Sequence, residues 1–189
     1  MFFQDLHGAP KAGSTAYTAA DGIVNSGDQT NIGNTIPKFY YGFTFGATYA
    51  GFDVNAFFQG VGSVQKYNNA LAQGITAAYG RNQLVDVLNA WIPQNPSTTM
   101  PRAVYGDPNG NNRFSDRFVE SAAYLRLQNF TVGYTIPPQL LEKTKAITRL
   151  RIFLTGTNLF TITKYKGIDP ENDFFPTPRQ VIVGVRASF

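Results

Sequence analysis

Residues 181–189 read Val-Ile-Val-Gly-Val-Arg-Ala-Ser-Phe, and this stretch decides the fold class. Alternate residues of a strand point to opposite faces, so Val181, Val183, Val185, Ala187 and Phe189 share one apolar face. A soluble domain seldom ends on an aromatic residue of such a face, because chain termini are usually solvated. An outer-membrane β-barrel has reason to do so, since its last strand faces lipid and closes against the first. An ordinary last strand of a β-sandwich is the alternative for this stretch alone.

The composition fits strands in which apolar residues alternate with small polar ones. The 189 residues are 43% hydrophobic and 14% aromatic, and only 15% are charged, against roughly 25% in a typical soluble domain. No apolar run approaches the roughly 18 residues of a transmembrane helix, so a membrane would have to be crossed by strands. The net charge of +4 is modest and scattered, which argues against nucleic acid as a partner. The absence of cysteine excludes a disulfide framework.

The first residues do not supply the export signal that an outer-membrane protein needs. Residues 1–8 read Met-Phe-Phe-Gln-Asp-Leu-His-Gly, without a basic start or a long apolar core, so they are not a signal peptide. We therefore expect Met1 to be an internal start and the chain to be the C-terminal piece of a longer protein. Residues 1–37 form one region in this interpretation: a loop rich in Gly, Ala, Thr, Asn and Asp.

The remaining residues, 38–189, show period-two alternation in long segments. Segments of about ten residues exceed the usual five or six of soluble strands and match a tilted membrane crossing. In the third segment the alternation changes phase near Gln128, and a β-bulge there would keep both apolar sets on one face. The pattern predicts an all-β fold, an open antiparallel sheet of about five long strands near residues 38–49, 52–62, 118–135, 149–161 and 179–188.

The connections between these strands alternate between short and long. Residues 63–117 form a long excursion, in which residues 81–91 look helical because Leu84, Val85, Leu88 and Trp91 share one side. Short turns on one side and long loops on the other are typical of outer-membrane barrels. Five strands cannot close such a barrel, and open sheet edges cannot lie in lipid. The expected fold is therefore part of a larger transmembrane barrel.

Two sequence blocks carry a family resemblance. Residues 124–137 read Tyr-Leu-Arg-Leu-Gln-Asn-Phe-Thr-Val-Gly-Tyr-Thr-Ile-Pro. Residues 158–171 read Asn-Leu-Phe-Thr-Ile-Thr-Lys-Tyr-Lys-Gly-Ile-Asp-Pro-Glu. In this order, and followed by the terminal strand, they resemble the SusC/RagA family of TonB-dependent outer-membrane transporters. Residues 36–37 and 91–96 look like further elements of that family, so the resemblance covers nearly the whole chain.

The resemblance implies a 22-stranded barrel with an N-terminal plug, of which this chain holds the last five strands. It also implies import of oligosaccharides or peptides across the cell outer membrane. The expected partners are a SusD-type surface lipoprotein, outer-membrane lipid, and the TonB complex through N-terminal parts that this chain lacks. The chain by itself is not expected to transport. The same topology makes residues 63–117 an extracellular loop.

Several side chains are candidates for roles in such a transporter. A charge on the lipid face would cost about 2–4 kcal/mol at mid-depth, so Arg126, Arg151 and Arg186 should face the lumen. There they either bind substrate or, as we expect, pair with carboxylates of the plug. In the long loop, aromatic side chains could stack on sugars or pack against the lipoprotein lid, and packing within the loop is the alternative; they are Tyr67, Trp91, Tyr105 and Phe114. The terminal residues Val181, Val183, Val185 and Phe189 look like the signal that barrel assembly machinery reads.

Metal and catalytic sites find little support in the sequence. Asp21, Asn25 and Asp28 resemble a calcium loop, but too few carboxylates accompany them, so we expect a structural loop. His7 is the only histidine and has no catalytic partner at motif spacing. Since no nucleophile, Walker or dinucleotide motif is present, we expect neither an enzyme nor a cofactor. The main competing reading is a soluble β-sandwich carbohydrate-binding module, and an outer-membrane enzyme is a more distant one.

Overall fold

The computed structural model describes residues 19–23, 26–142 and 146–189. The chain forms two compact units. The first comprises Met1–Gly33 and Asn69–Val119, and the second comprises Asn34–Asn68 and Glu120–Phe189.

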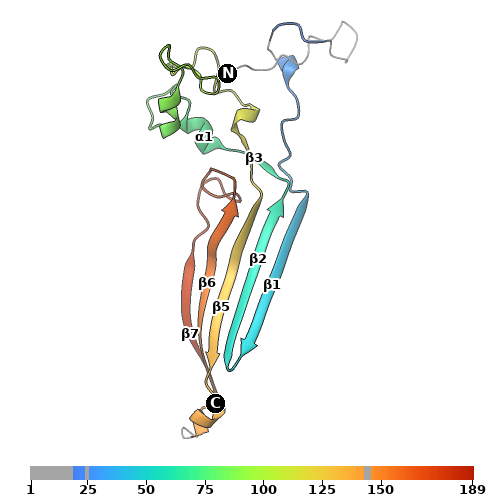
Figure 1. Cartoon of the computed structure of the whole chain (residues 1–189), viewed down its shortest axis with the longest axis vertical. Coiled ribbons are helices and arrows are strands. Elements are labelled where there is room, and N and C mark those ends of the chain that lie inside the picture. Colours follow the sequence, from blue (N-terminus) through green and yellow to red (C-terminus); the bar gives the residue numbers. More distant parts are fainter. Residues whose placement is uncertain (1–18, 24–25, 143–145) are drawn as a thin grey trace. The chain divides into compact units, whose positions relative to one another are not determined.

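The second unit is built on one open antiparallel sheet, shown in Figure 1. Its strands lie in the order β1-β2-β5-β6-β7 and are 9 to 15 residues long. This confirms the predicted open sheet of five long strands and rules out the sandwich, which would require two sheets packed face to face. The strands are β1 (Phe39–Tyr49), β2 (Phe52–Gly62), β5 (Tyr124–Thr135), β6 (Arg149–Thr163) and β7 (Gln180–Ser188).

The register places most apolar side chains of the five strands on one face, although Phe57, Phe153 and Ile182 lie on the other. In antiparallel pairs, directly opposite residues share a face. Phe43 lies opposite Phe58, which lies opposite Leu127 in β5. Nearer the other end of the sheet, Val132 lies opposite Leu154, which in turn lies opposite Val183. We call this the apolar face and the opposite side the polar face.

A bulge at Gln128 reconciles the two halves of β5. Phe57 pairs with Asn129 whereas the next residue, Phe58, pairs with Leu127, so Gln128 is the extra residue. The bulge shifts the alternation by one position, which places Phe130 on the same face as Leu127. The phase change predicted from the sequence is therefore confirmed.

The β1–β2 hairpin turns through Ala50 and Gly51, which have φ angles of 47° and 85°. Positive φ at both central residues matches the twist of the flanking strands. A Cβ at Gly51 would also lie 2.9 Å from the carbonyl oxygen of Thr135, so glycine is needed here for space as well as for φ.

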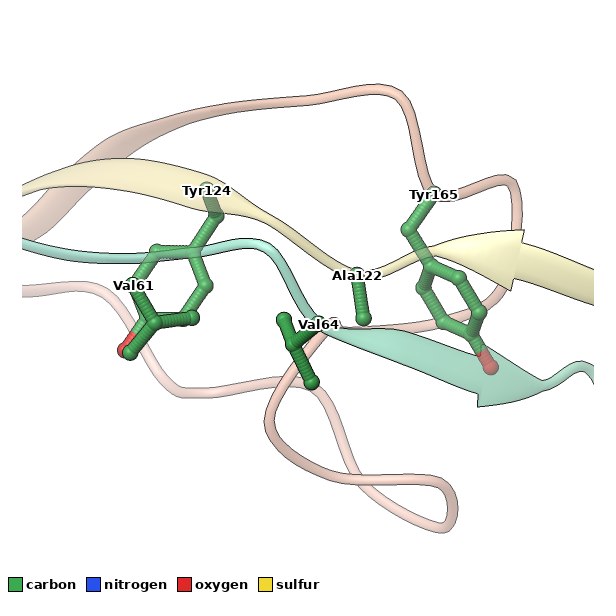
Figure 2. Packing of buried hydrophobic residues seen from close by; sticks show 5 residues of the cluster. All are labelled: Val61, Val64, Ala122, Tyr124 and Tyr165. Carbon is green, nitrogen blue, oxygen red and sulfur yellow. The ribbon is translucent and has the colours of Figure 1, made fainter. Parts of the chain in front are cut away.

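The third long strand begins later than the expected residue 118. Val119–Ser121 forms the short strand β4, which pairs with β3 (Gln65–Tyr67) as a separate two-stranded sheet. A buried cluster lies where β2 and β5 leave the large sheet: Val61, Val64, Ala122, Tyr124 and Tyr165 (Figure 2). Residues 116–121 form η3 (Asp116–Phe118) and β4 instead, so the alternation predicted for residues 118–123 is not used in the large sheet.

The predicted helix at residues 81–91 is wrong. Only the 3-10 helix η2 (Val85–Asn89) forms there, and Val85 and Leu88 are about 80% exposed. Leu84 occupies the N-cap position, and its hydrocarbon side chain accepts no capping hydrogen bond, so the segment lacks a helix start signal. The other short helices are η1 (Ser26–Asp28), α1 (Asn69–Gly74), η3 (Asp116–Phe118) and, in the short connection after β5, α2 (Pro138–Leu141). Within the described parts of the chain, no helix is long and apolar enough to cross a membrane.

Candidate functional site

Arg126, on the polar face of β5, is the centre of a nearly buried ion-pair network. Its Nη2 atom lies 3.0 and 2.9 Å from the two carboxylate oxygens of Asp169. Its Nη1 atom donates to Glu171 at 2.5 Å, and its Nε atom donates to the hydroxyl of Thr161 at 2.9 Å. The side chain is only 4% exposed. Such a buried cation is tolerated because every nitrogen of the guanidinium has an acceptor.

Asp169 accepts hydrogen bonds from Arg126 and from residues of its own loop. Burial alone would raise its pKa. Backbone N–H groups of Glu171 and Thr177, the Thr177 hydroxyl and Arg126 donate to the carboxylate and lower the pKa to about 2. The aspartate therefore stays ionised at neutral pH and ties residues 164–179, the β6–β7 loop, to the polar face.

The same loop is fastened at a second place. Lys66 of β3 pairs with Asp173 at 2.9 Å and donates to the carbonyl oxygen of Pro170 at 3.3 Å. Tyr165 contributes its ring to the buried cluster of Figure 2, and its hydroxyl donates to Asp173 at 3.4 Å. Burial, together with the nearby carboxylates of Asp173 and Glu120, raises the pKa of Tyr165 to about 12. Tyr165 remains a hydrogen-bond donor as a result.

A second ion pair lies farther along the polar face. Arg151 of β6 makes a bidentate contact with Asp53 of β2, at 2.9 Å for Nε and 2.5 Å for Nη2. To reach β2 it passes over β5 at Gly133, where a Cβ would lie 2.3 Å from the guanidinium. Arg186 lies directly opposite Arg151. Because Arg151 leans toward Asp53, two cations that face each other across the strands are kept apart.

The three arginines predicted to face the lumen share the polar face, and two of them form ion pairs within this chain. Arg126 and Arg151 pair with carboxylates of this chain, and Arg186 has no ion-pair partner among the described residues. Sequence reasoning named none of the partners Asp53, Asp169 and Glu171 as site residues. A signal for two of them was present, because Asp169 and Glu171 end the second resemblance block and Arg126 lies in the first.

The candidate aromatic residues Trp91, Tyr105 and Phe114, all in the first unit, do not line one pocket. Trp91 lines a pocket of about 340 Å³, and neither Tyr105 nor Phe114 belongs to its lining. Tyr105 is 81% exposed and Phe114 66%. Tyr67 lies in β3, in the second unit, and burial raises its pKa. We call the cavity beside Trp91 the loop pocket; its lining includes Met100, Arg102, Asp107, Asn109 and Asn111.

The remaining predicted site residues lie in the terminal strand and in the Asp/Asn-rich segment near residue 21. Val181, Val183 and Val185 lie exposed on the apolar face of β7, and Phe189 directly after it is 87% exposed. In the described residues, no cluster of three or more His, Cys, Asp or Glu side chains could hold a metal ion. Asp21 uses its carboxylate locally, accepting from the N–H of Ile23 at 2.9 Å. Asn25 and His7 lie outside the described residues.

Comparison with known proteins identifies relatives that are much longer than this chain. No family model matches it. The chain is 35% identical over 155 residues to TonB-dependent receptor P3 of Formosa agariphila. The aligned region covers 82% of this chain and 15% of the receptor. It is 39% identical over 83 residues to TonB-dependent receptor SusC of Bacteroides thetaiotaomicron. This aligned region covers 40% of this chain and 8% of SusC.

A solved structure gives the same result at the level of the fold. The RagAB peptide importer in its closed-closed state matches with a TM-score of 0.80 and 27% identity, over 97% of this chain and 21% of that chain. Both sequence blocks, the single open sheet and these relatives agree. The chain belongs to the SusC/RagA family of TonB-dependent outer-membrane transporters and corresponds to a fragment of the barrel.

Proposed function

We propose that this chain is the C-terminal part of the barrel wall of a transporter that imports oligosaccharides or peptides across the outer membrane. The supporting observation is the apolar face, which continues without a charged residue across all five strands. Gathering most of the apolar side chains on one side of an open sheet suits a wall between lipid and a polar lumen. On this proposal residues 63–117 are an extracellular loop, and residues 1–37 form a loop region.

The polar face would line the lumen. Arg126 and Arg151 would then brace the inside of the wall through their ion pairs, because each already uses its guanidinium within this chain. Arg186 would be free to meet the plug or a passing substrate. A wall segment of this kind binds and positions, and we propose no enzymatic activity and no cofactor for it.

The proposed partners follow from the relatives. RagAB is described as a peptide importer, and by analogy we propose a SusD-type surface lipoprotein as the lid over the barrel mouth. Tyr67, Trp91, Tyr105 and Phe114 are proposed contacts for the substrate or this lid, supported by the exposure of Tyr105 and Phe114. The TonB complex would act through parts of the protein outside this chain. Val181, Val183, Val185 and Phe189 are proposed as the signal for barrel assembly.

Site-directed labelling tests the proposed orientation directly. The chain has no cysteine, so single cysteines can be placed at Tyr105 in the long loop and at Gln139 in the β5–β6 connection, within a full-length protein freed of other cysteines. Both side chains are exposed, and the antiparallel sheet puts the two connections at opposite ends of the strands. We expect Tyr105→Cys to react with an impermeant maleimide in intact cells, and Gln139→Cys only after the outer membrane is permeabilised.

The alternative outcomes are informative. If only Gln139→Cys reacts in intact cells, the orientation of the sheet is the reverse of the proposed one. Equal reaction of both cysteines in intact cells would mean that the sheet does not separate two compartments, and the proposed function would fall.

A further inference from the structure

We propose that the loop pocket binds one sugar ring of a transported oligosaccharide, so that the substrate of this protein is a glycan. This inference rests on the proposed transport function and names its substrate class. The pocket has a volume of about 340 Å³, at the lower end of the roughly 300–1,000 Å³ of small-molecule sites. It offers space for one ring, from which the rest of a chain would extend into solvent.

The wall combines one flat aromatic surface with polar side chains. Trp91 is the only tryptophan of the chain; the residue is 36% exposed and lines the cavity. Around it lie Arg102, Asn109 and Asn111, and no hydrogen bond between described residues uses the polar side-chain atoms of these three. The pocket therefore presents an aromatic ring with amide and guanidinium groups that still lack partners.

The backbone of the turn that carries two of these polar groups is closed by hydrogen bonds before any ligand binds. Asp107 accepts the backbone N–H groups of Asn111 and Asn112, each at 2.8 Å, through its two carboxylate oxygens. Gly110 donates to the carbonyl oxygen of Asp107 at 2.9 Å. The turn that carries Asn109 and Asn111 is closed by these bonds, and a preorganised site loses less conformational entropy on binding.

A pyranose ring matches this arrangement better than a peptide does. One face of the ring is a patch of C–H groups that an indole can cover, while the rim carries hydroxyls that both donate and accept. Amide side chains also offer a donor and an acceptor each. Peptides are usually recognised along an exposed strand edge or by a long groove, and none of the strands of the described chain lines this pocket.

The test uses the full-length transporter, purified in detergent. An array of short oligosaccharides of diverse linkage and a library of short peptides are the probes. We expect glycans to bind, Trp91→Ala to weaken that binding about tenfold or more, and Trp91→Phe to weaken it less. Asp86→Asn is the matched control, because Asp86 is exposed in the same loop and does not line the pocket.

Hydroxyl-radical footprinting of the unmutated protein gives a second readout that does not depend on folding of the variants. A bound glycan should protect Trp91 and Met100, which line the pocket, and leave Tyr79 unprotected, since Tyr79 is 55% exposed and lies outside the lining. Peptide binding alone, no binding from the array, or bound glycan without protection of Trp91 would overturn the glycan proposal. The labelling of Tyr105→Cys and Gln139→Cys would be unaffected by these outcomes, so failure of the proposed function would be recognised separately.

Discussion

At the scale of single residues, the polar face is organised by two arginines that cross from their own strand to another segment. Arg126 joins β5 to the β6–β7 loop, and Arg151 joins β6 to β2 over Gly133. Asp169 accepts hydrogen bonds from four donor groups at once, which keeps this nearly buried carboxylate ionised. These contacts fix the β6–β7 loop against the sheet.

Removing the guanidinium of Arg126 should destabilise the barrel. Arg126→Ala leaves the buried carboxylate of Asp169 without its cation, and breaking a buried pair in this way typically costs about 3–5 kcal/mol. We expect a loss of this order in the free energy of unfolding of the full-length barrel, measured with urea in detergent. Lys164→Ala is the control, since Lys164 is exposed and no ion pair among the described residues includes it. Equal stability of the two variants would mean that Arg126 is dispensable.

Acid should weaken the same loop. The pKa of Asp169 in the folded protein, about 2, lies below its ordinary value of 3.8. Its contribution is therefore complete above about pH 4 and is lost as the pH falls through about 2, amounting to about 2 kcal/mol. We expect the free energy of unfolding to fall by this much more in the unmutated protein than in Asp169→Asn between pH 4 and pH 2. Parallel pH curves for the two proteins would contradict the assignment.

At the scale of elements, the bulge in β5 decides which face each half of the strand presents. With Gln128 counted as the extra residue, Leu127, Phe130 and Val132 all lie on the apolar face. A strand that spans a membrane cannot tolerate a change of phase without such a device, because polar side chains would then face lipid.

Two single-residue deletions in β5 should consequently have opposite effects. Deleting Gln128 leaves Leu127 and Phe130 on the same face, because regular alternation then replaces the bulge. Deleting Thr131 turns Val132 and Tyr134 toward the polar face. We expect near-normal amounts of the first variant in the outer membrane and a strong loss of the second, measured by fractionation and by the heat-modifiable band of folded barrels on gels. Similar loss in both variants would show that the phase of β5 does not control assembly.

At the scale of the whole molecule, the described chain has an open sheet with a long strand at each edge. β1 and β7 each pair on one side only, and the apolar face exposes large side chains such as Phe45 and Val183, at 61% and 72%. Unpaired edges and an uncovered apolar surface are both unfavourable in water. Such a sheet is stable only where its edges are paired and its apolar face is covered.

The chain produced by itself should therefore aggregate in plain buffer and require detergent to remain dispersed. The measurement is size-exclusion chromatography with light scattering, with and without a mild detergent. The Phe43→Ser and Val183→Ser double variant should reduce aggregation only partly, because the strand edges remain open. A monomer with a cooperative thermal transition in plain buffer would contradict the wall interpretation.

The sequence by itself determined the long strands, their two faces and the bulge at Gln128, because period-two alternation is a local property of each strand. It did not determine the ion pairs. Arg126 and Asp169 are 43 residues apart, and Arg151 and Asp53 are 98 apart, so each pair forms only once strand register and loop closure bring the side chains together.

The helix expected at residues 81–91 did not form for a related reason. Its apolar spacing was compatible with a helix, but a segment without a cap needs a neighbouring surface to bury its apolar side, and the tertiary structure leaves Val85 and Leu88 exposed. The loop pocket beside Trp91 likewise exists only in the folded loop, since its lining joins residues that the sequence separates.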